Sequence, residues 1–70
     1  MARLDKQFPN LKPVDRTFLL LTYAGLPTRT ICVICEITVG NYYNKRQRLK
    51  SRFEASDAPD AHMFIKYMDN

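Results

Sequence analysis

The residues with the clearest chemistry lie in one basic segment, residues 38–53 (TVGNYYNKRQRLKSRF). No acidic residue interrupts its five cations, which are Lys45, Arg46, Arg48, Lys50 and Arg52. Tyr42, Leu49 and Phe53 recur at helical spacing, so one face of the segment can be buried while a basic face stays outside. Because a basic helix anchored by an apolar stripe fits the major groove of a duplex, the segment predicts a DNA-reading helix.

The distribution of charge supports a polyanionic partner. The net charge is +4. Residues 40–53 hold the five cations, whereas residues 54–70 carry several carboxylates against Lys66 alone. Charge concentrated on one segment favours binding to nucleic acid. The alternative interpretation is a solvated helix face with ordinary lysines and arginines.

Seventy residues allow one domain with three or four helices around a single core. The composition, 46% hydrophobic and 26% charged, is typical of a folded chain. No apolar stretch approaches the ~18 residues that span a bilayer, and the Met1 end lacks a signal-peptide pattern. We therefore expect a cytoplasmic protein without a membrane partner.

Two helices are expected ahead of the basic segment. Residues 1–10 are expected to be a linker, or a lead-in that places Phe8 on the core. A helix over 13–24 has Pro13 at its first position, Asp15 in its first turn and Gly25 as a left-handed stop. The residues expected to face inward from this helix are Val14, Phe18, Leu20, Leu21 and Ala24.

A second helix over 28–35 would face inward through Ile31, Ile34 and Cys35, although its β-branched content also suits a strand. Glu36 and Ile37 form the next turn. Thr38 is expected to cap the helix over 39–53.

The last helix is expected over 58–68, with Asp57 as its cap and Pro59 in its first turn. Its inward side would carry Ala61, Phe64, Ile65 and Met68.

Two helices joined by a short turn, the second of them basic, define a helix-turn-helix. The predicted fold is therefore all-α, a compact four-helix domain with a central helix-turn-helix. Cys32 would lie where two helices cross closely, and Ile37 would insert the turn into the core. The exposed arc of the third helix is expected to comprise Asn41, Tyr43, Asn44, Lys45, Gln47 and Arg48.

The span from Leu11 to Phe53 resembles the LuxR/GerE-type helix-turn-helix at the C-terminus of many bacterial transcription regulators. The matching segments are LKP, AGLPTRTI and ITVGNYYNKRQRL, and they align without a gap. The form is most similar to divergent versions in regulators of Bacteroides-like bacteria. Region four of sigma factors has a similar pattern. The resemblance implies sequence-specific binding of double-stranded DNA in transcriptional regulation, as the output domain of a larger regulator.

The chain departs from this family at three positions. Glu36 stands where the family usually has glycine, so it must tolerate a left-handed backbone or the turn must shift. Tyr42 replaces a usual valine at the root of the third helix. Pro27 replaces a usual Ser or Thr cap. These changes affect the angle of the recognition helix.

The resemblance also assigns residue roles. Tyr43, Asn44 and Gln47 fall where the family reads bases, and amide side chains can form paired hydrogen bonds with adenine. Phosphate contacts, which position a domain without specifying sequence, would come from Thr28, Arg29, Asn41, Lys45, Arg48 and Lys50.

The other candidate constellations favour structural interpretations. Cys32 and Cys35 form a CxxC pair, but a structural zinc site needs four ligands and the chain adds only a distant His62. We therefore interpret the cysteines as small core residues. With no partnered nucleophile and base and no glycine-rich phosphate loop, we expect neither an enzyme nor a cofactor or metal site.

Met63 and Tyr67 suggest an apolar strip on the last helix. In the resembled family this helix often forms the dimer contact, so a homodimer through 58–68 is favoured, and the alternative is that the strip covers the core.

Two other functions stay open. One is a protein-interaction module of the same fold that docks on RNA polymerase or another regulator. The other is an adaptor or RNA-binding domain that uses the same basic helix.

Overall fold

Five helices and no strand make up residues 2–68, the part of the chain described by the computed structural model. This confirms the all-α class. In chain order the helices are α1 (Ala2–Gln7), α2 (Pro13–Tyr23), α3 (Thr28–Cys35), α4 (Val39–Glu54) and α5 (Ala61–Met68).

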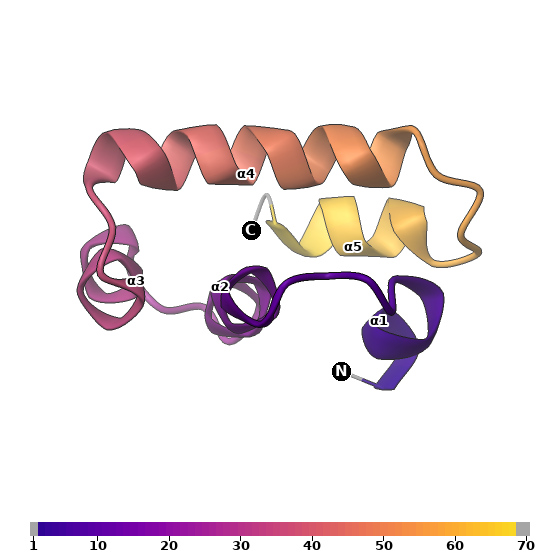
Figure 1. Cartoon of the computed structure of the whole chain (residues 1–70), viewed down its shortest axis with the longest axis horizontal. Coiled ribbons are helices and arrows are strands. Elements are labelled where there is room, and N and C mark those ends of the chain that lie inside the picture. The colour runs from indigo at the N-terminus through magenta and orange to yellow at the C-terminus, as the bar shows by residue number, and fades with distance from the viewer. Residues whose placement is uncertain (1, 69–70) are drawn as a thin grey trace.

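The longest helix, α4, lies antiparallel beside α5 along one side of the molecule (Figure 1). In the same view α2 and α3 are seen nearly end-on, with α3 beneath the start of α4 and α2 nearer the end of α5. Contacts join α2 to α3 and α5, and α3 to α4. The basic helix is therefore supported from one side by the rest of the domain.

The core is built from all five helices. Phe18 and Leu19 of α2 are fully buried, and Ile31 of α3 is 1% exposed. An aromatic cluster joins the first and last parts of the chain to α4: the Phe8 and Phe53 rings lie 4.9 Å apart, and those of Phe53 and Phe64 lie 5.5 Å apart. Each such pair contributes about 0.5–1.5 kcal/mol beyond its buried area.

The N-terminal residues are not a linker. Residues 2–7 form α1, and Leu4 is only 1% exposed. Leu4 and Phe8 are four residues apart, so they share one face of a helical turn and enter the core together. The expectation that Phe8 reaches the core is correct, and the helix that delivers it was not anticipated.

The last helix begins at Ala61, so the expectation of a start at 58 is wrong, and neither Asp57 nor Pro59 belongs to it. The boundary is set by Asp60, whose carbonyl accepts the Phe64 N–H at 3.0 Å. The Asp60 carboxylate accepts from Gln7 Nε2 at 2.7 Å, and its N–H donates to Gln7 Oε1 at 3.0 Å. This double contact with α1 holds Asp60 outside the helix.

Four residues expected to face inward are exposed: Val14, Leu20, Ala24 and Ile34. The reason is that each helix packs through a narrower face: α2 through Phe18, Leu19 and Thr22, and α3 through Ile31 and Cys32. The buried Thr22 hydroxyl donates to the Phe18 carbonyl at 2.8 Å, which satisfies it within its own helix.

Candidate nucleic-acid interface

The turn between α3 and α4 has a left-handed residue at Glu36, with φ 56° and ψ 46°. The Ile37 N–H donates to the Cys32 carbonyl at 3.0 Å, and the Glu36 N–H donates to the Val33 carbonyl at 3.3 Å. This is the hydrogen-bond pattern of a Schellman stop, which normally uses glycine. Glu36 therefore keeps the left-handed turn rather than shifting it.

Thr38 caps α4 as the sequence predicts. Its Oγ1 accepts the Asn41 backbone N–H at 3.1 Å. The Thr38 carbonyl also accepts the Tyr42 N–H at 2.9 Å, which starts the helical ladder. The cap and the turn together fix where α4 begins.

Two neighbouring tyrosines at the start of α4 have different environments. Tyr42 is 4% exposed, and its ring centroid lies 5.2 Å from that of Phe18 in α2. Tyr43 is 55% exposed and packs edge-on against Tyr42, with ring centroids 5.1 Å apart. Tyr42 therefore roots the helix, and Tyr43 presents an oriented ring to solvent.

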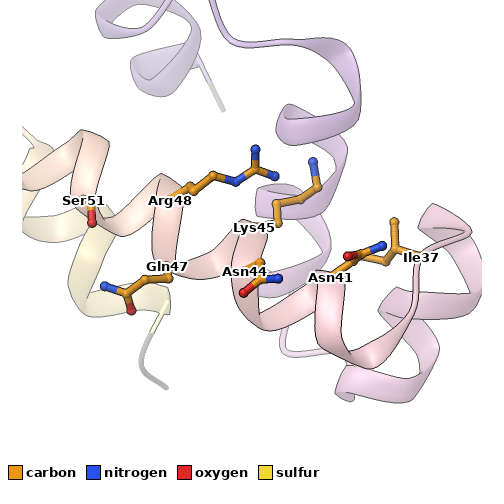
Figure 2. Close-up of a pocket in the computed structure, with 7 residues that line it drawn as sticks. All are labelled: Ile37, Asn41, Asn44, Lys45, Gln47, Arg48 and Ser51. Atoms are coloured by element: carbon orange, nitrogen blue, oxygen red, sulfur yellow. The ribbon is translucent and has the colours of Figure 1, made fainter.

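A shallow hollow runs along the outer side of α4 (Figure 2). Lys45 and Arg48 extend to one side of the helix in this view, while Gln47 extends away from them. Asn41, Asn44, Gln47 and Arg48 are exposed, in agreement with the expected arc. The hollow is lined by Ile37, Asn41, Asn44, Lys45, Gln47, Arg48 and Ser51.

Lys45 is less available than the sequence predicts. Its Nζ lies 2.5 Å from Asp15 Oδ1, and the two side chains are only 14% and 17% exposed. The pair links the first turn of α2 to the middle of α4. A phosphate would therefore have to compete with Asp15 for the Lys45 ammonium.

Two other cations of α4 serve the fold. Arg46 Nη2 donates to the Met68 carbonyl at 2.6 Å, which satisfies a terminal acceptor of α5. The Arg52 guanidinium lies 5.9 Å from the centroid of the Phe8 ring. Sequence reasoning missed both roles, because the partners come from the two ends of the chain.

The start of α3 is the second element of the candidate interface. Pro27 precedes it and supplies no side-chain cap, so the first N–H groups of α3 lack a side-chain acceptor from that residue. Thr28 is half-buried and Arg29 is exposed. A positive helix end with an adjacent guanidinium suits a phosphate.

The two cysteines of α3 differ in their surroundings. Cys32 is buried, and its Sγ lies 3.9 Å from the Thr38 carbonyl oxygen. Burial raises the pKa of the Cys35 thiol, and the nearby Lys45 charge only partly opposes this.

Within residues 2–68, no three His, Cys, Asp or Glu side chains are grouped so as to hold a metal ion. No helix in the same range has the length and apolar character needed to cross a membrane.

Comparison of the chain with known proteins returned no matching family model, no matching curated protein and no matching solved structure. The candidate interface is therefore assigned from the positions and exposure of its residues.

Proposed function

We propose that this domain binds double-stranded DNA in a sequence-specific manner and acts in transcriptional regulation. The observation that carries the proposal is α4, whose inner side is rooted in the core and whose outer side is polar and basic. A helix of this length extends for about 24 Å, which is enough to lie across the major groove.

Base reading is assigned to Tyr43, Asn44 and Gln47. All three are exposed and lie within the first nine residues of α4, on the half that the turn and the Thr38 cap hold in place. The amides are suited to paired hydrogen bonds with adenine, and the Tyr43 ring is suited to contact a thymine methyl group.

Phosphate contacts are assigned to both helices of the motif. Arg48, Lys50 and Asn41 lie on α4, while Thr28 and Arg29 begin α3. Lys45 contributes to the extent that a phosphate displaces Asp15. Contacts from two helices would fix the orientation of α4 on the duplex.

A LuxR/GerE-type domain is supported by the order of α2, α3, turn and α4. The three matching segments fall on these elements in the expected order: LKP, AGLPTRTI and ITVGNYYNKRQRL. In that family the last helix often forms the dimer contact, so a homodimer through α5 is the competing assignment for its exposed Met63 and Tyr67 side chains. Region four of sigma factors, which binds promoter DNA, is the related alternative.

A second candidate function is a protein-interaction module that docks on RNA polymerase or another regulator. One observation favours it: α3 exposes 72% of Val33 and 50% of Ile34. Apolar side chains on the first helix of the motif are suited to a protein contact rather than to phosphate.

Selection from a pool of randomised duplexes tests the proposal. We expect the wild-type chain to enrich one motif, and Asn44→Ala to enrich a different or shorter one. Lys6→Ala, on α1 and outside the interface, serves as the matched control and should enrich the wild-type motif. Failure of the wild-type chain to enrich any sequence would refute sequence-specific reading.

A further inference from the structure

An apolar groove lies between α1, α2 and α5, outside the proposed DNA interface. Its walls include Leu4 of α1, Leu20 and Tyr23 of α2, and Met63 and Tyr67 of α5. Leu20 is 49% exposed and Tyr67 is 46% exposed, so the groove presents large apolar side chains to solvent. A small domain gains nothing in stability from leaving such groups uncovered.

The groove is already shaped by contacts within the chain. The Tyr23 hydroxyl donates to the Phe64 carbonyl at 3.3 Å. The Tyr23 ring also stands edge-on to Tyr67, with centroids 6.1 Å apart. A partner would therefore meet a surface that needs little rearrangement, which lowers the entropic cost of docking.

One cation lies in the wall of the groove, and a second lies beside it. Arg3 forms part of the wall, its side chain is 72% exposed, and its ion pair with Asp60 is long, at 3.9 Å. Lys66 is exposed and lies three residues after Met63, on the same side of α5 but outside the residues that line the groove. The nearby carboxylates have partners within the chain: Asp60 accepts from Gln7 as well as facing Arg3, and Asp5 pairs with Arg16 at 2.8 Å.

We propose that this groove docks an acidic amphipathic helix of another protein. Its apolar residues, at i, i+3, i+4 and i+7, would cover Leu20, Met63 and Tyr67, and its flanking Asp or Glu would face Arg3 and Lys66. A second copy of α5 fits less well, because its sequence AHMFIKYM carries no acid. A two-fold pairing across the Met63–Tyr67 strip would bring the Lys66 side chains of the two copies toward each other.

The test uses three designed helical peptides of about 18 residues, a length at which isolated helices become stable. The first has leucines on one face flanked by Glu, the second has Lys in place of Glu, and the third has the first composition with its leucines scattered around the helix. Binding to the full chain is followed by amide chemical shifts and fluorescence anisotropy without DNA. We expect only the first peptide to shift signals of Leu20, Met63 and Tyr67.

Variants at exposed positions locate the contact. Leu20→Ser should weaken binding of the first peptide more than about tenfold, because it removes a leucine from the interface. Lys66→Glu should weaken it about fivefold through the lost and reversed rim charge. Lys6→Glu makes the same charge change on α1, two residues beyond Leu4 and outside the groove walls, and should leave binding within about twofold of wild type.

Three results would overturn the proposal. They are equal binding of the acidic and basic peptides, shifts confined to α4, and no binding at millimolar peptide. Sedimentation equilibrium adds a fourth: a dimer abolished by Leu20→Ser would assign the groove to a second copy. Because these measurements contain no DNA, their failure is distinguishable from failure of the DNA-binding proposal.

Discussion

Lys45 of α4 and Asp15 of α2 form a mostly covered ion pair, with Nζ and Oδ1 2.5 Å apart. The pair fastens the proposed recognition helix to the helix beneath it, and it places a carboxylate beside the surface that we assign to DNA. Its effects on stability and on DNA binding should therefore have opposite signs.

Asp15→Asn should lower the free energy of unfolding by about 1–2 kcal/mol, between the values for exposed and buried pairs. It should also raise affinity for duplex DNA about two- to fivefold at low salt, because Lys45 is released and a nearby negative charge is lost. Urea denaturation and fluorescence anisotropy measure the two effects.

Asp5→Asn controls for net charge. The Asp5–Arg16 pair is more exposed, with side chains at 39% and 56%. Asp5→Asn should therefore lower the free energy of unfolding by less than about 0.5 kcal/mol. If Asp15→Asn and Asp5→Asn change DNA affinity equally, the effect is one of net charge, and the local role of Asp15 is wrong.

Glu36→Gly should stabilise the domain by about 1 kcal/mol, because the residue has φ 56° and glycine adopts this conformation without strain. Glu36→Ala removes the carboxylate but keeps the Cβ, so it should leave thermal stability nearly unchanged. Equal melting temperatures for the two variants would show that the backbone at Glu36 is unstrained.

Gly25→Ala tests the same conformation from the other direction. Gly25 has φ 81°, and a Cβ placed there would meet no atom within 4 Å. The substitution should therefore destabilise the domain by about 1 kcal/mol through backbone conformation alone. Thermal unfolding measures the change, and an unaltered melting temperature would contradict the assignment.

Tyr42→Ala and Tyr43→Ala should separate folding from binding. Tyr42 is 4% exposed, so its loss should cost about 3–5 kcal/mol and can unfold the domain. Tyr43 is 55% exposed, so its loss should cost less than about 1 kcal/mol yet weaken binding to the preferred duplex. A Tyr43→Ala variant with wild-type affinity for that duplex would remove the ring from the set of base-reading residues.

Cys35 should react slowly with iodoacetamide below about pH 8.5, since burial raises its thiol pKa and the thiolate is the reactive form. The alkylation rate should reach half of its maximum at a higher pH than the rate of a free model thiol does. Mass spectrometry of the alkylated protein gives the rate, and fast labelling at neutral pH would indicate an activated cysteine.

The helices that form the motif were predictable because local signals mark their ends: Pro13 and Gly25 bound α2, and Thr38 caps the start of α4. Apart from Lys45, which Asp15 covers, the exposed arc followed from the spacing of Tyr42 and Leu49. What the sequence did not predict depends on residues far apart in the chain. Gln7 moves the start of α5 to Ala61 by binding Asp60, and no local pattern announces that contact.

The same limit applies to the site. The sequence marks Lys45, Arg46 and Arg52 as equivalent cations of one basic run. In the fold each has a different partner, because Asp15, the Met68 carbonyl and the Phe8 ring approach α4 from other helices and loops. The availability of a cation therefore depends on tertiary contacts, whereas its presence can be read from composition.

The most direct test of the central claim is fluorescence anisotropy of the chain on a mixed-sequence DNA duplex at about 50 and 200 mM salt. Three or four cations on phosphates, drawn from Arg29, Lys45, Arg48 and Lys50, predict an affinity that falls roughly 40- to 150-fold between these salt concentrations. Arg48→Ala should make the slope of log affinity against log salt shallower by the contribution of about one phosphate contact. No binding at the lower salt, even at high micromolar protein, would contradict the assignment of α4 as a DNA-binding helix.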